Sequence, residues 1–189
     1  MFKLILLCVI IGINLYLVLE KYFMKSKKNL IIGILSLILL CAVVIGIRTL
    51  ITGSYAGNYQ RSIYNDNSKI ASKGDSYSFL NRVCTNEDNK TSLEFTFTGM
   101  DTIWKLETSQ DTSVNIEYKS EISSGKFKVV LINPDGEVIN ILEQSTSGDK
   151  DVNLINGKSR IKIVGNNARG KLQLSISSNK DVKLIPVNN

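Results

Sequence analysis

The chain has 189 residues, of which 43% are hydrophobic and 21% are charged, and its formal net charge is +6. It contains no His, which excludes Ser-His-Asp and Cys-His catalysis, His-ligated metal sites and the commonest general base. Residues 1–51 carry six basic residues and one acidic residue, so most of the positive excess lies there. Because a nucleic-acid interface needs basic residues gathered on one face of a folded domain, we expect no nucleic-acid partner.

Two apolar segments predict a pair of transmembrane helices, at about residues 2–19 and 30–51. A bilayer core about 30 Å thick needs roughly 20 helical residues, and both segments are close to that length. Residues 20–29 lie between them and contain four Lys, which places this loop in the cytoplasm by the positive-inside rule. The sequence therefore predicts a two-span cell-membrane protein with the lipid bilayer as a partner and a large C-terminal domain outside. Residues 1–51 would form the transmembrane hairpin.

Each predicted span contains one notable polar side chain, Asn14 in the first and Ser36 in the second. In an antiparallel hairpin the two would lie at similar depth and could bond to each other, which is worth about 0.6–2 kcal/mol. Alternatively, Asn14 is simply tolerated near the interface, or it faces another membrane protein. Cleavage of the second span after Ala56, as in a signal peptide, is a further alternative, although its apolar core exceeds the usual length of about 7–15 residues.

The remainder of the chain predicts an extracytoplasmic all-β domain. Residues 52–78 are polar and lack periodicity, so we expect a juxtamembrane stalk. Residues 79–189 contain short segments in which apolar and polar residues alternate, as in 93–97 (LEFTF), and this alternation is typical of half-buried strands. Turn sequences at 134–136 (PDG) and 156–157 (NG) separate several of these segments. The fold class that we expect is a β-sandwich, jelly-roll-like.

Residues 99–176 also resemble a β-domain of membrane-anchored, exported proteins of low-GC Gram-positive bacteria, most of them uncharacterised. The resemblance is carried by SGKFKVVLINPDG at 124–136, GKSRIKIVG at 157–165 and GKL at 170–172. It implies surface exposure and a sandwich fold. It implies no catalytic residues.

The sequence contains no phosphate-binding loop, zinc-ligand spacing or nucleophile elbow, so we expect no cofactor and no metal. Trp104 is the candidate for stacking against a sugar, or it is a core residue. Arg160, Lys162, Arg169 and Lys171 could line a ligand-binding face of one hairpin, or form a solvated basic edge that prevents aggregation. Cys84 is either a buried free thiol or the site of an intermolecular disulfide.

These observations favour a non-enzymatic binding or interaction module at the cell surface, with a cell-envelope glycan or another membrane protein as its partner. An alternative is an accessory subunit of a membrane complex that acts through the hairpin. A third is a carbohydrate-active enzyme that uses paired carboxylates, the one acid-base machinery that the composition leaves.

Overall fold

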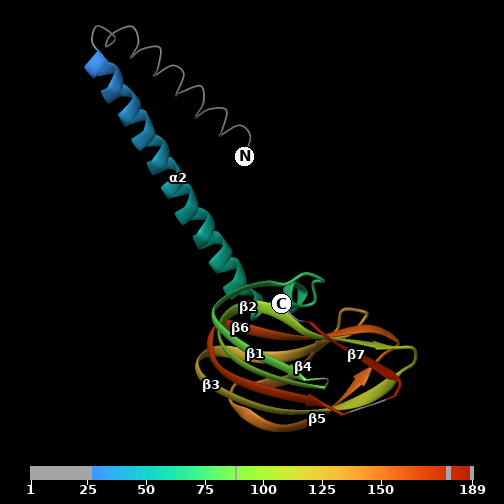
Figure 1. Cartoon of the computed structure of the whole chain (residues 1–189). Coiled ribbons are helices and arrows are strands. Elements are labelled where there is room, and N and C mark those ends of the chain that lie inside the picture. Colours follow the sequence, from blue (N-terminus) through green and yellow to red (C-terminus); the bar gives the residue numbers. More distant parts are fainter. Residues whose placement is uncertain (1–26, 88, 178–179, 188–189) are drawn as a thin grey trace. The chain divides into compact units, whose positions relative to one another are not determined.

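The structure, a computed structural model, describes residues 27–87, 89–177 and 180–187 (Figure 1). Two helices, α2 (Lys27–Ile63) and α3 (Asn67–Ile70), precede seven strands. The strands are β1 (Ser76–Glu87), β2 (Lys90–Thr108), β3 (Thr112–Ile132), β4 (Val138–Glu143), β5 (Thr146–Leu154), β6 (Gly157–Ile176) and β7 (Val182–Pro186). The chain divides into two compact units, Met1–Tyr55 and Ala56–Asn189. All the strands belong to the second unit.

The second apolar segment of the sequence forms a helix, but α2 does not end where the predicted span ends. It continues past Arg48 and through the polar residues 53–61 to Ile63. Within the part of the chain that the structure describes, no helix has both the length and the apolar character needed to cross a membrane. This finding contradicts the predicted two-span membrane localisation and removes the support for a bilayer partner. The predicted first span lies outside the described residues.

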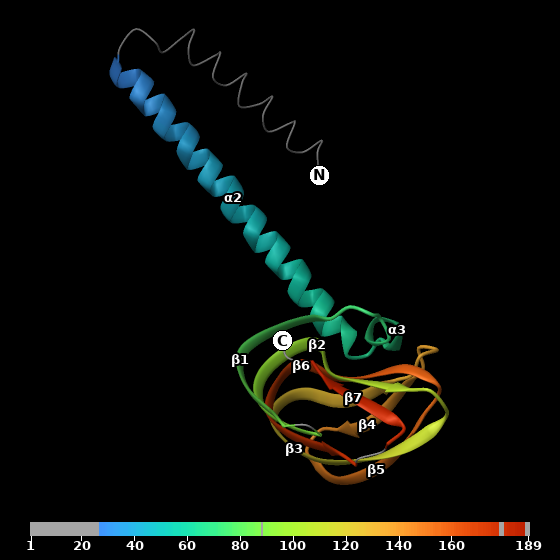
Figure 2. The ribbon, with the colours of Figure 1, turned by 45° about the vertical axis from the view of Figure 1, so that its right-hand side comes forward.

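The strands form an antiparallel β-sandwich, which confirms the predicted all-β fold, whereas the jelly-roll connectivity stays a prediction. Three long strands, β2, β6 and β3, each pass through both layers (Figure 2). One layer has the order β1-β2-β6-β3-β5 and uses the first half of β2, where β1 pairs with it. The other has the order β7-β2-β6-β3-β4 and uses the second half of β2. We call these the β1 layer and the β7 layer.

The long strands change layer at irregularities in their pairing. In β2 the register with β6 shifts between Phe97 and Gly99 and again between Thr102 and Trp104. In β3 it shifts twice between Ile122 and Lys126. Such bulges bend a strand and increase its local twist. Gly99 has a φ of 111°, and a Cβ atom there would overlap the carbonyl oxygen of Ser76. A glycine is therefore required at this bend.

The main core fills the space between the two layers. Its aromatic centre contains Phe95 stacked on Phe127 at 4.7 Å between ring centroids, and Phe97 stacked on Phe79 at the same separation. Trp104, Val129, Leu131 and Ile161 are fully buried in this core. Alternation therefore holds along much of each strand, with apolar side chains inward.

A second, smaller core covers the outer face of the β7 layer. It contains Ile63 at the end of α2, Tyr64 directly after it, and Ile70 at the end of α3. These side chains pack against four residues of that face: Met100, Val130, Ile132 and Val164. Asp66 caps α3 by accepting a hydrogen bond from the Lys69 N–H at 3.2 Å. Residues that were predicted to be a polar stalk are therefore helical and packed against the sandwich over this stretch.

Candidate functional site

The outer face of the β1 layer carries a groove of about 780 Å³ that runs across the strands. Its polar lining comes from β1, β2, β6 and β3: Asn81, Glu94, Thr96, Arg169, Lys171, Glu121 and Ser123. The register explains this composition, because Glu94 pairs with Lys171 and Lys171 pairs with Glu121. Residues that face each other across neighbouring strands point to the same side of a sheet.

A second groove of about 600 Å³ lies two residues further along β2, β6 and β3 and extends to β5. Its lining includes Lys90, Ser92, Glu117, Lys119, Asp149 and Gln173. Ser92 pairs with Gln173, which pairs with Lys119, so this row neighbours the first row on the same face. We refer to the two grooves together as the polar face of the β1 layer.

The charges of the polar face are balanced, and four of them form two ion pairs. Lys171 lies 3.5 Å from Glu94, and Lys119 lies 2.9 Å from Glu121. The hydrogen bond from Lys119, followed by the charge of that ammonium, lowers the pKa of Glu121 below its usual value. The same hydrogen bond raises the pKa of Lys119. These groups therefore stay ionised at neutral pH and offer both donors and acceptors to a ligand.

Aromatic side chains contribute little to this face. Phe95 and Tyr118 border the grooves, but Phe95 is buried and Tyr118 packs against the main core. Trp104, the candidate for sugar stacking, is fully buried in the core. A ligand therefore cannot reach its indole ring.

Of the basic residues proposed from the sequence, Arg169 and Lys171 line the polar face. Arg160 and Lys162 lie in the other half of β6, in the β7 layer, and both bind the protein's own backbone. Arg160 donates to the carbonyl oxygens of Ser72 at 2.7 Å and Ala71 at 2.9 Å. Ser36 lies on α2 and is exposed, and its proposed partner Asn14 lies outside the described residues.

Lys162 has no exposed surface, which is unusual for a lysine. It lies 3.0 Å from Asp75 Oδ1 and donates to the carbonyl oxygens of Ser72 and Gly74, at 2.9 Å each. Burial lowers the pKa of Lys162, and the hydrogen bond and charge of Asp75 oppose this shift. The alternation of apolar and polar residues could not reveal that Lys162 is buried and paired within the protein. Alternation places a polar residue on the outer face of a sheet, and such a face is normally exposed to solvent. We call these contacts the Lys162 latch.

The structure offers little for catalysis. Among the described residues, no three His, Cys, Asp or Glu side chains are grouped so that they could hold a metal ion. A carboxyl that acts as a general acid has a raised pKa. In contrast, Asp66, Glu107 and Glu121 have lowered pKa values, in each case chiefly because they accept a hydrogen bond.

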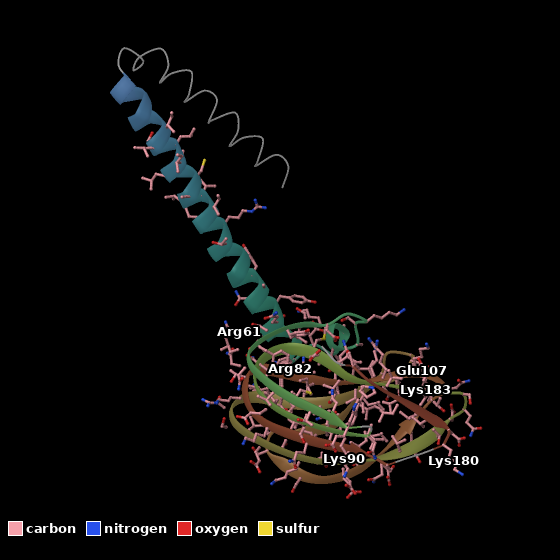
Figure 3. The ribbon with its side chains drawn as sticks, in the orientation of Figure 1. Arg61, Arg82, Lys90, Glu107, Lys180 and Lys183 are labelled. Carbon is pink, nitrogen blue, oxygen red and sulfur yellow. The ribbon has the colours of Figure 1, made fainter. Side chains whose placement is uncertain are left out.

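A third cavity of about 460 Å³ lies where β2 ends and where β6 and β7 begin. Three of its lining residues, Glu107, Lys180 and Lys183, are labelled in Figure 3. Lys158 and Glu107 form an ion pair of 2.9 Å there, and Glu107 has a lowered pKa mainly through this contact. The ammonium of Lys158 is largely exposed. Because exposed ion pairs are screened by water and salt, this pair contributes little to stability.

No family model matches the chain, and no curated protein matches it. Among solved structures, it is similar to the CBM35 of Cellvibrio japonicus Abf62, with 9% identity, a TM-score of 0.33, and 59% of this chain and 81% of that chain covered. It is also similar to the carbohydrate binding module CBM6cm-2 of Cellvibrio mixtus lichenase 5A in complex with cellotriose, with 14% identity, a TM-score of 0.34, and coverage of 57% and 91%. A third similar structure is the enzymatically active domain of tailspike protein 4 from bacteriophage CBA120, with 8% identity, a TM-score of 0.33, and coverage of 60% and 19%. These likenesses are distant.

Proposed function

We propose that the domain formed by residues 56–189 is a non-catalytic binding module, and that a glycan chain binds across its polar face. The observation that carries this proposal is the groove of about 780 Å³ that crosses β1, β2, β6 and β3. Neighbouring strands lie about 4.8 Å apart, so four strands give a trough roughly 14 Å long. Such a trough accommodates a short stretch of an extended polymer rather than a compact small molecule.

The chemistry of the polar face favours a neutral, polyhydroxylated ligand. The first groove offers two basic side chains, Arg169 and Lys171, and two acidic ones, Glu94 and Glu121. A hydroxyl group can donate to a carboxylate and accept from an ammonium or guanidinium group. Because the charges cancel, the face offers no net attraction to a polyanion or a polycation. A neutral glycan, with many hydroxyls along its length, fits this pattern best.

A purely binding role agrees with the chemistry of the chain. The sequence contains no His, and the lowered pKa of Glu121 keeps this carboxylate ionised rather than available as a general acid. The ion pairs along the face suit recognition, since each charged hydrogen bond to a ligand is worth about 1.5–3 kcal/mol.

The test is co-sedimentation of the full chain with insoluble cell-envelope glycan and with neutral polysaccharides, at low and at high salt. We expect retention that persists at high salt, and at least a tenfold weaker association for Arg169→Ala, because the guanidinium supplies bidentate donors. Lys183→Ala changes a similar charge at the third cavity and should leave retention unchanged. Equal retention of all three proteins would refute the groove as the site. Retention that disappears at high salt would show that a charged polymer, not a neutral glycan, is bound.

A further inference from the structure

Four strands of the described sandwich, β1, β4, β5 and β7, pair on one side only and so form its edges. Three of these edges are short or carry the features that usually prevent pairing with other chains. β4 has six residues, β7 has five and ends at Pro186, and β5 carries the charged run 149–151 (DKD). Charges, proline and shortness all discourage the addition of another strand. β1 differs, because it is 12 residues long.

β1 also carries the exposed large apolar side chains of the sandwich. Among the described strands, the large apolar residues that are exposed are Tyr77, Leu80 and Val83, with exposed fractions of 38%, 88% and 59%. All three lie on β1. Arg82, the basic residue of this strand, lies 3.5 Å from the buried Asp101 and so does not project to repel an incoming strand. Apolar exposure on an open edge is typical of an interaction surface.

We propose that β1 pairs antiparallel with β1 of a second copy of this chain over Asn81–Glu87, with the two-fold axis at Cys84. The pairing of β1 with β2 is irregular between Phe79 and Asn81 and regular from Asn81 onward. The regular part is therefore the one that can add a strand.

The sequence of this part is complementary to itself in that register. Cys84 lies opposite Cys84 of the second copy, and Val83 lies opposite Thr85. Each charged residue lies opposite an amide, Arg82 opposite Asn86 and Glu87 opposite Asn81, so no like charges meet. The contact is isologous and therefore closes at a dimer. Cys84 is exposed and free, with its thiol 3.5 Å from Asn86 Oδ1.

The dimer has a consequence for ligand binding that rests on the proposed function. Asn81 of β1 lines one end of the larger groove. In a continuous antiparallel sheet the two-fold axis is perpendicular to the sheet, so both polar faces lie on the same side. The two grooves then run end to end across the shared edge. A long polymer could bind both at once, which raises its apparent affinity without any new contact.

The experiment uses the full chain with Cys8→Ser and Cys41→Ser, so that Cys84 is its single thiol. Cα atoms directly opposite each other in paired antiparallel strands lie about 4.5–5.5 Å apart, within the range that a disulfide needs. Mild oxidation should therefore give a covalent dimer, and addition of Val83→Lys should slow its formation at least tenfold. Asn153→Lys, on the exposed edge β5 of the same layer, should leave the rate unchanged. Failure of Cys84 to cross-link, or equal rates for both lysine variants, would overturn the proposal.

A second measurement separates this proposal from the proposed function. Val83→Lys should bind a short neutral oligosaccharide as the parent does, but should lose affinity for the corresponding long polymer. If neither protein binds any glycan while Cys84 still cross-links, the dimer stands and the glycan proposal fails. If both proteins bind the long polymer equally and Cys84 does not cross-link, the glycan proposal stands and the dimer proposal fails.

Discussion

Replacement of Asp75 by Ala tests the Lys162 latch most directly. The carboxylate of Asp75 lies 3.0 Å from the Lys162 ammonium and accepts a hydrogen bond of 2.8 Å from Thr102. The variant removes a carboxylate that lies within bonding distance of an ammonium group that is fully buried. A buried charge without its partner has lost its solvation without compensation.

The expected cost follows from what remains around Lys162. Removal of one partner from a buried ion pair typically costs about 3–5 kcal/mol. The Asp75 side chain is 23% exposed, which weakens the pair, and the carbonyls of Ser72 and Gly74 still accept from the ammonium. We therefore expect a loss of about 2–3 kcal/mol in the free energy of unfolding, or roughly 30- to 140-fold in the unfolding equilibrium.

Urea unfolding of the full chain, followed by the fluorescence of Trp104, is the assay, since this is the one Trp of the sequence and it is fully buried. Glu121→Ala is the matched control, because it breaks an ion pair of 2.9 Å whose two side chains are both about 60% exposed, and its midpoint should barely move. Removal of Asp75 also lowers the pKa of Lys162 further. In the variant, the folded protein then loses this proton before the unfolded chain does, so stability recovers as the pH rises towards the ordinary lysine pKa of 10.5. Equal midpoints for the two variants, or a deficit that grows at alkaline pH, would refute the reasoning.

Three further substitutions test the two cores and the bend of β2. Val129→Asp should prevent folding, because the side chain is fully buried in the main core and the new charge would have no partner. Lys126→Asp changes an exposed position of the same strand and should fold. Circular dichroism distinguishes the two outcomes. Gly99→Ala should lower the urea midpoint strongly, since its Cβ would overlap the Ser76 carbonyl oxygen at a φ of 111°. Tyr64→Phe loses a 2.7 Å hydrogen bond to a carboxylate and should cost about 1 kcal/mol. Because burial and that carboxylate raise the Tyr64 pKa, the advantage of the wild type over this variant should shrink above pH 10, where the unfolded tyrosine ionises.

The strands of the sandwich could be recognised from the sequence because alternation is local. Leu93, Phe95 and Phe97 face the main core as their spacing predicts. Val130 shows where this reasoning reaches its limit: it is as buried as its neighbours Val129 and Leu131, because the end of α2 and α3 cover the outer face. A covering segment that lies some 65 residues earlier in the chain leaves no signal in the strand itself.

The candidate site was accessible to sequence reasoning only in part. Arg169 lines the polar face, and its role in binding stays a prediction. Its neighbours there, Glu94 and Glu121, follow from the register of β2, β6 and β3, which no local pattern gives. Lys162 resembles Arg169 in the sequence, since both are basic residues of one strand with apolar residues before or after them. They differ because β6 changes layer between them. Lys162 is covered by residues 72–75, whereas Arg169 lines the polar face.

The sharing of β2, β3 and β6 between the two layers has a consequence for how this chain can vary in length. A one-residue insertion in a strand turns every later side chain to the opposite face. Because β2, β3 and β6 run through both layers, an insertion in the part that belongs to one layer would also reverse the side chains in the part that belongs to the other layer. The bulges at Phe97–Gly99 and Ile122–Lys126 are the points where an odd residue is already absorbed. We expect related sequences to gain and lose residues at these bends and in the hairpin loops. We also expect the two layers always to occur together in one domain.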